Sequence, residues 1–116
     1  MPYRPADESL PLTPLSFEIL LALLDGDRHG YAILQVLESR LSATIPMRTG
    51  TLYRALSRLL DEGLIEKAGH AEGDDERRVN YRITSRGRKI ARAEAERLAD
   101  QVAAARAHRL LPQDRR

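Results

Sequence analysis

The chain has 116 residues, is 42% hydrophobic, contains no cysteine and carries a formal net charge of +2. This length suits one globular domain with short appendages, and the lack of cysteine excludes a disulfide framework and any thiolate metal site. The net charge excludes little by itself, but residues 84–116 hold nine bases against four acids, whereas residues 1–83 hold ten against thirteen.

The N-terminal segment, residues 1–12, is polar and rich in proline. It lacks the basic and then apolar organisation of a signal peptide, and we expect it to be a flexible arm. The longest apolar stretch, residues 19–24, is far shorter than the roughly 20 residues that span a bilayer. We therefore expect a soluble, cytoplasmic protein with no membrane partner.

Two helices are predicted after the arm. Thr13 followed by Pro14 offers a helix cap and a proline at the first helical position, and the apolar run that follows ends at the turn of residues 25–27. This first helix is apolar on most sides, so it should be buried. The second helix, from residue 29, has one apolar face made by Ile33, Val36, Leu37 and Leu41.

A third helix is predicted between residues 47 and 62. Its apolar stripe has helical spacing and consists of Leu52, Ala55, Leu56, Leu59 and Leu60. Thr49 can cap its start and Gly63 can end it. Its charges oppose the helix dipole, because Arg48, Arg54 and Arg58 come first and two acids come last.

The opposite face of this third helix is polar. It consists of Gly50, Tyr53, Arg54, Ser57, Arg58 and Asp61. A small residue lets the backbone approach another surface, arginines reach phosphates or guanine, and hydroxyls donate hydrogen bonds. In a helix-turn-helix the start of the second helix enters the major groove, so this face is a candidate DNA-binding surface. The alternative is a solvated face of an amphipathic helix.

Residues 64–83 predict a β-hairpin. Val79, Tyr81 and Ile83 alternate on its returning strand, and a polar loop precedes them. Arg77 and Arg78 on this strand could insert into a minor groove or hold phosphates. The alternative is a self-neutralising surface loop, because four acids lie between residues 72 and 76.

A last helix is predicted from about residue 86 to residue 110, capped by Thr84 or Ser85. Its apolar positions recur at alternating spacings of four and three, as in a helix that packs along a partner. These positions, called the dimer seam below, are Ala91, Ala95, Leu98, Val102 and Ala105. The alternative is that the helix packs back on its own domain.

The predicted fold is mainly α with a small β-hairpin: a winged helix-turn-helix over residues 13–84 and a C-terminal dimerisation helix over residues 85–110. Residues 111–116 are predicted to be a disordered tail. The three histidines lie in three different segments, without the spacing of a zinc site. We therefore expect no enzyme, no metal and no cofactor.

Four segments in this order, PLSFEILLALLDGDRHGYAI, GTLYRAL, LLDEGLIEK and RRVNYRITSRGRK, resemble the signature of the PadR-like transcriptional regulators over about residues 12–105. The resemblance implies a winged helix-turn-helix that dimerises through its last helix, binds a palindromic operator in double-stranded DNA and usually represses. It is to the short subgroup, without an additional C-terminal domain, so a small-molecule effector would bind near the dimer interface.

The pattern and the resemblance together predict a set of DNA-binding residues. The alternative function is a winged-helix module that binds proteins and has no sequence-specific DNA binding. The predicted DNA-binding residues are Tyr31, Arg48, Thr49, Gly50, Thr51, Tyr53, Arg54, Ser57, Arg58, Arg77 and Arg78.

Overall fold

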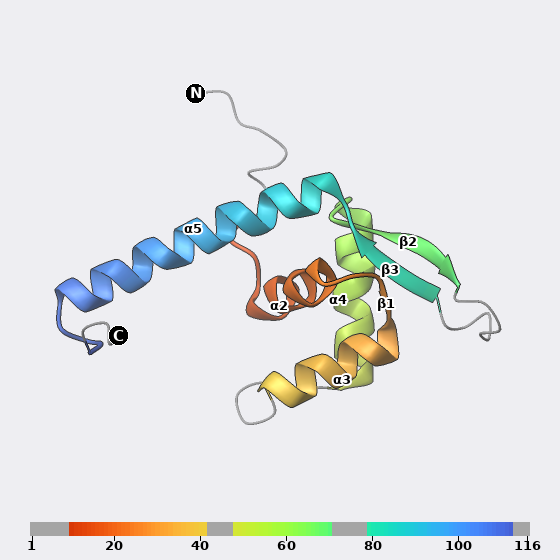
Figure 1. The fold of residues 1–116 in the computed structure, drawn as a ribbon, viewed down its shortest axis with the longest axis horizontal. Coiled ribbons are helices and arrows are strands. Elements are labelled where there is room, and N and C mark those ends of the chain that lie inside the picture. The colour runs from red at the N-terminus through yellow and green to blue at the C-terminus, as the bar shows by residue number, and fades with distance from the viewer. Residues whose placement is uncertain (1–9, 42–47, 71–78, 113–116) are drawn as a thin grey trace.

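The computed structural model describes residues 10–41, 48–70 and 79–112. Three helices are gathered on one side of a small sheet, and the longest helix runs past them and projects away from the body of the domain (Figure 1). The helices are α2 (Pro14–Leu24), α3 (Gly30–Leu41), α4 (Thr49–Asp61) and α5 (Ser85–Ala107). The strands are β1 (Arg28–His29), β2 (Ile65–His70) and β3 (Val79–Ile83). The predicted fold, a mainly helical winged helix-turn-helix with a C-terminal helix, is confirmed.

The sheet is antiparallel, with the strand order β1-β3-β2. Strands β2 and β3 form the predicted hairpin, in which Ile65 pairs with Ile83. Strand β1 was not predicted, because two residues are too few to show an alternating pattern. It pairs with β3 through Arg28 opposite Tyr81 and His29 opposite Asn80. The wing is therefore attached directly to the segment that leads into α3.

The starts of three helices have side-chain caps. Thr13 accepts a hydrogen bond from the backbone N–H of Ser16 at 3.0 Å, as predicted. Of the two predicted caps of the last helix, Thr84 is the one observed, because it accepts a hydrogen bond from the N–H of Gly87 at 2.9 Å, whereas Ser85 is already helical. His29 Nδ1 accepts one from the N–H of Ala32 at 3.2 Å, which satisfies an amide in the first turn of α3.

The predicted cap of α4 by Thr49 is wrong. Thr49 is the first helical residue, and the capping position is taken by Arg48, which makes no capping hydrogen bond. The end of α4 follows the prediction for Gly63, which has φ +74°. Gly63 donates its N–H to Leu60 O and Leu64 donates to Leu59 O, both at 3.0 Å, so the last carbonyls of the helix are satisfied.

The core lies where α2, α3 and α4 meet the sheet. The predicted stripe of α4 is confirmed, because Leu52, Leu56 and Leu59 are buried and Ala55 and Leu60 pack at the edge. The core also includes Leu12, so the end of the predicted arm packs on the domain. The other large buried residues are Ile19, Leu20, Leu23, Ile33, Leu37, Leu64, Ile65, Tyr81, Ile83 and Ile90.

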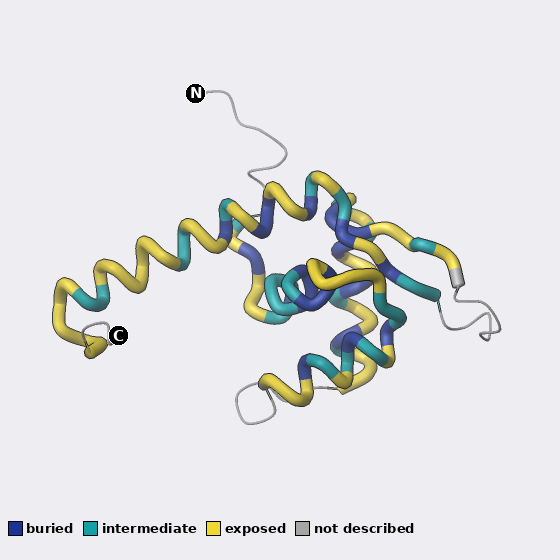
Figure 2. The backbone as a smooth tube through the Cα atoms, in the orientation of Figure 1, coloured by how far each residue is buried: buried dark blue, intermediate teal, exposed yellow. Residues whose placement is uncertain are grey.

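The buried residues of helix α5 all lie in its first half, and its second half is mostly exposed (Figure 2). Ile90, Ala91 and Glu94 are buried against the domain. Glu94 is 2% exposed and accepts two hydrogen bonds from Arg97, at 2.9 and 2.7 Å. These bonds hold the pKa of Glu94 below its ordinary value although burial raises it, and the N–H of Leu12 acts in the same direction as Arg97.

Candidate nucleic-acid interface

The outer face of α4 is exposed to solvent. Its six residues are those opposite the buried leucines, and all are exposed: Gly50, Tyr53, Arg54, Ser57, Arg58 and Asp61. Because the inner leucines fix the rotation of the helix, Arg54 points directly away from the core and Arg58 and Tyr53 lie on opposite flanks. The structure thus places five of the eleven residues predicted to bind DNA on one exposed face: Gly50, Tyr53, Arg54, Ser57 and Arg58.

One flank of α4 is in contact with the start of α3. A Cβ atom on Gly30 would lie 2.7 Å from Cζ of Tyr53, so only glycine lets the Tyr53 ring lie across this turn. Tyr53 remains 43% exposed, and the neighbouring Tyr31 is 57% exposed. Burial raises the pKa of the Tyr81 phenol, and Tyr53 adds to the increase. Tyr53 therefore packs across the start of α3 and still presents polar surface.

The other flank of α4 opens onto a groove of about 320 Å³ beside the start of α2. Arg54, Arg58 and Thr51 line it from α4, and Thr13 and Ser16 line it from α2. The first turn of α2 contains no acidic residue. The groove therefore combines two guanidinium groups with hydroxyls and a helix start, which is a favourable environment for a phosphate.

The start of α4 is open and positively charged. Arg48, Thr49 and Gly50 are all exposed, and the first turn contains no acid. A Cβ atom on Gly50 would meet only Nη1 of Arg54, at 3.5 Å, which is an ordinary contact. The glycine is thus not required for packing within the chain, and its free surface is available to an approaching partner.

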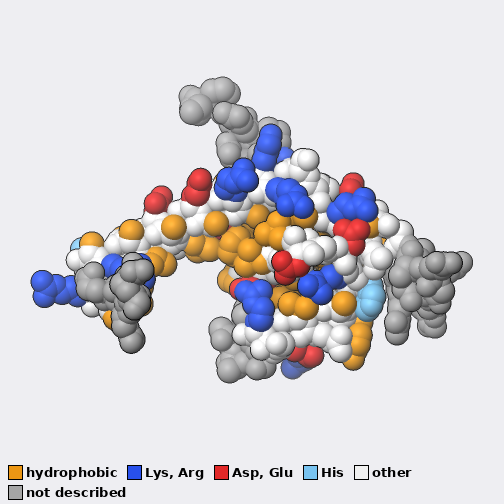
Figure 3. Space-filling view, viewed as in Figure 1, with side chains coloured by type: hydrophobic (Ala, Val, Ile, Leu, Met, Phe, Trp, Pro, Cys, Tyr) orange, Lys and Arg blue, Asp and Glu red, His pale blue; other side chains and the backbone are white. Residues whose placement is uncertain are grey.

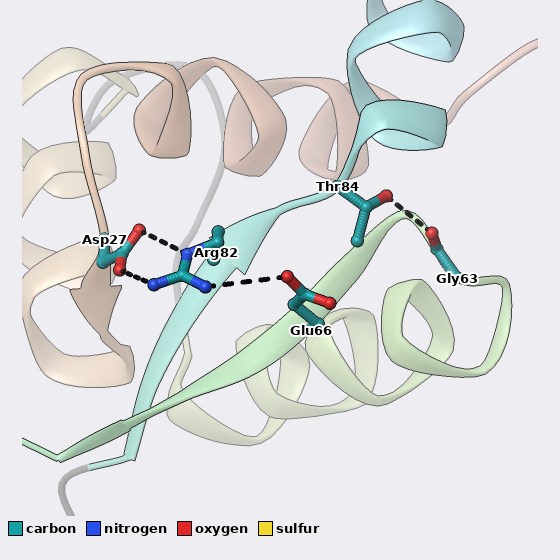
Figure 4. A network of polar contacts seen from close by, with 5 residues as sticks. All are labelled: Asp27, Gly63, Glu66, Arg82 and Thr84. Carbon is teal, nitrogen blue, oxygen red and sulfur yellow. Dashed lines mark hydrogen bonds and ion pairs between the residues drawn. The ribbon is translucent and has the colours of Figure 1, made fainter.

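Arg77 and Arg78, which the sequence predicts to contact DNA from the wing, lie outside the described residues. The described part of the sheet has an ionic network (Figure 4). Arg82 Nη2 lies 3.0 Å and Nε 3.4 Å from the two oxygens of Asp27, and Nη1 lies 3.8 Å from Glu66 Oε2. Hydrogen bonding to Asp27 raises the pKa of Arg82. Sequence reasoning missed this network, because the pair depends on the unpredicted strand β1.

The dimer seam on α5 is divided between two environments. Ala91 is buried in its own domain, and Leu98 and Ala105 are partly covered. Ala95 is exposed, and Val102 is 39% exposed. An apolar groove of about 270 Å³ runs between α2 and α5 and is lined by Phe17, Leu21, Leu24, Arg88, Ala91, Arg92 and Ala95. Hydrophobic side chains gather along this line (Figure 3).

Within the described segments, no group of three or more acidic, histidine or cysteine side chains is placed to hold a metal ion. The same segments contain no helix that is both long and apolar enough to cross a membrane.

Comparison with known proteins gives one family and several relatives. An uncharacterized protein of Lysinibacillus sphaericus is 36% identical over 70 residues, which are 60% of this chain and 64% of that protein, less than two thirds of its length. A transcriptional regulator from Clostridium thermocellum has 30% identity and a TM-score of 0.64, over 78% of this chain and 86% of the regulator.

Bacillus subtilis PadR, solved in complex with operator DNA, has 25% identity and a TM-score of 0.62, over 70% of this chain and 46% of that one. The model of the transcriptional regulator PadR-like family matches residues 19–93, which include the second half of α2, the helix-turn-helix, the wing and the start of α5. Members of this family regulate transcription and are not enzymes. The match covers more than half of the sequence, and the chain belongs to the family of PadR-like transcriptional regulators.

Proposed function

We propose that the protein binds a palindromic operator in double-stranded DNA as a homodimer, with α4 in the major groove, and represses transcription in the cytoplasm. The observation that carries the proposal is the outer face of α4. Arg54 and Arg58 are exposed there, Arg48 lies at the start of the helix, and Gly50 leaves room for close approach. Such a face meets both the phosphates and the base edges of a duplex.

The residues of the outer face of α4 are proposed to make different contacts with DNA. Arg54 and Arg58 both line the groove beside α2, and Arg58, which lies nearer to that flank of α4, would hold a backbone phosphate. Arg54 lies centrally on the outer face and would reach the acceptor edge of guanine or a phosphate. The tyrosines 31 and 53 and the hydroxyls of Thr49, Thr51 and Ser57 would add hydrogen bonds, and Arg77 and Arg78 would contact the DNA from the wing. The operator complex of Bacillus subtilis PadR supports this use of the fold.

The proposed dimer is supported by the uncovered half of α5. The helix has 23 residues and is therefore about 34 Å long. Its second half carries Leu98, Val102 and Ala105, which its own domain covers only in part. Pairing of two such helices about a two-fold axis would present two α4 helices to half-sites roughly 34–36 Å apart. A small-molecule effector would bind beside this interface.

The experiment is a gel shift with the promoter fragment upstream of the protein's own gene, over a range of salt concentrations. We expect salt-sensitive binding that prefers this fragment to unrelated DNA. Arg54→Ala should weaken binding by about 1–3 kcal/mol and leave the melting temperature nearly unchanged, because the side chain is exposed. Tyr53→Phe, which removes only the hydroxyl, should have a smaller effect in the same direction.

Lys89→Ala is the matched control, because Lys89 is an exposed base on α5, away from the outer face of α4. It removes the same charge and should change the affinity far less than Arg54→Ala. Absence of any sequence preference at low salt would refute the proposal and favour a winged-helix module that binds proteins. A large fall in melting temperature for Arg54→Ala would assign that residue to the fold instead.

A further inference from the structure

Arg82 connects all three parts of the wing sheet on its solvent-exposed side (Figure 4). Its own strand, β3, is the central strand. Two of its hydrogen bonds go to Asp27, the residue that immediately precedes β1, and its ion pair goes to Glu66, its register partner on β2. One guanidinium group therefore contacts both neighbouring elements of the central strand.

Both of these elements are close in the chain to the helix-turn-helix, one before it and one after it. Strand β1 ends at His29, and α3 begins at the next residue. Strand β2 begins at Ile65, four residues after α4 ends. The pairing of β3 with β1 and β2 therefore fixes the orientation of the wing relative to α3 and α4.

The backbone alone holds β1 weakly, because this strand has two residues and two paired positions. The free energy that keeps β1 in register with β3 is therefore small. The bidentate pair between Arg82 and Asp27 has a defined geometry, and it lies beside these paired positions, so it can hold the register. Exposed ion pairs contribute little to the free energy of unfolding, so this pair affects the orientation of the wing more than the stability of the domain.

We propose that Arg82 and Asp27 are positioning residues for DNA binding, which hold the wing at the angle that lets it and α4 contact one duplex together. This inference rests on the proposed function. Neither residue is required to touch DNA. The network carries one positive and two negative charges, so a bystander network would on balance repel a polyanion.

Because Asp27 is negatively charged, the two readings of its role predict opposite changes in DNA affinity when it is neutralised. If Asp27 were a bystander, Asp27→Asn would remove a negative charge and bind DNA as tightly as wild type or more tightly. The inference predicts the opposite: Asp27→Asn and Arg82→Gln should each lower affinity for the promoter fragment by about threefold to tenfold, because preorganisation is lost. The double variant should bind no worse than the single variants, because both changes break one interaction.

Affinity is measured as a function of salt, well below the lowest melting temperature of the variants, together with amide hydrogen exchange of β1 and β3. We expect the salt dependence of Arg82→Gln to keep its wild-type slope, and the amides of β1 and β3 to exchange faster in both variants. The control is Glu38→Gln on α3, which neutralises an exposed acid that has no ion pair among the described residues. It should bind at least as tightly as wild type.

Wild-type affinity or tighter binding for Asp27→Asn would overturn the inference and leave the proposed function intact. A salt slope reduced by about one in Arg82→Gln would also overturn it, because Arg82 would then contact a phosphate directly. Failure of the wild-type protein to prefer the promoter fragment would overturn the proposed function, and the inference with it.

Discussion

Two glycines near helix starts show how differently the same residue type is used in this chain. At Gly87 a Cβ atom would collide with the carbonyl oxygen of Leu64 and lie 2.8 Å from Cγ1 of Ile83. That carbonyl also accepts the N–H of Thr84 at 3.1 Å, so it is not free to shift. At Gly50 a Cβ atom would meet only the end of the flexible Arg54 side chain. Gly87 is thus required by the fold, and Gly50 is not.

We predict opposite outcomes for the two alanine variants. Gly87→Ala should lower the free energy of unfolding by about 1–3 kcal/mol, because the added methyl group overpacks the junction of α5 with the wing. Gly50→Ala should leave the stability unchanged or raise it by up to about 1 kcal/mol, because alanine favours the helix, and should weaken DNA binding. Thermal unfolding and gel shifts measure the two effects. Equal stability of both variants would contradict the packing argument.

The contribution of Glu94 to stability should depend on pH. Its pKa is lowered from an ordinary value of 4.5 through hydrogen bonds to Arg97, so its contribution to stability is present above that value and is lost as the pH falls through the lower, folded-state pKa. Glu94→Gln should therefore melt below wild type near neutral pH, and the difference should shrink in acid below the ordinary pKa. The control Glu96→Gln changes an exposed neighbour and should show no such trend. A constant difference for Glu94→Gln would rule out this role of the carboxylate.

Among the elements, the helices could be predicted from sequence because apolar spacing, caps and glycine stops are local signals. Their exact ends and β1 could not. The local rules favour Thr49 as a cap, but it lies one residue too late, and Arg48 occupies that position without a hydrogen bond. Arg58 lies in the last turn of α4, and a second base compensates the negative end of the helix dipole from outside, because Nε of Arg86 in α5 donates to Glu62 O at 3.0 Å. This compensation comes from a distant segment, which periodicity within α4 cannot reveal.

The start of α4 is less stable than it could be, because Arg48 at the capping position makes no capping hydrogen bond. Arg48 has extended backbone angles suited to a cap, with φ −119° and ψ 146°. Arg48→Asp should stabilise the protein by about 1 kcal/mol, because aspartate can accept an N–H of the first turn and favours the positive end of the dipole. The same change should weaken DNA binding strongly. Arg48→Ala separates the effects: it should weaken binding without raising the melting temperature. Lower stability of Arg48→Asp would disprove the capping argument.

At the scale of the whole molecule, the sequence indicates which faces are apolar or basic, but not which of them share a surface. The contacts of Tyr53 with Gly30 and of Arg82 with Asp27 join segments more than 20 residues apart, and no local pattern predicts them. The dimer seam is another example. Its five positions look alike in sequence, whereas the structure buries Ala91 in its own domain and leaves Val102 exposed. Among the seam positions, those after Ala91 are therefore exposed or partly exposed, and a second chain could contact them.

Because Val102 is exposed, a substitution there tests the proposed dimer without disturbing the core. Val102→Glu should convert the proposed dimer to monomers, because it introduces a charge where two α5 helices would exclude water. Binding to a palindromic fragment should fall far more than stability of the monomeric fold, since the two α4 helices would no longer be linked. Ala103→Glu is the matched control, because Ala103 is exposed on the same turn but off the seam. Light scattering coupled to size exclusion measures the mass, and a wild-type monomer, or equal effects of the two variants, would exclude this seam as the interface.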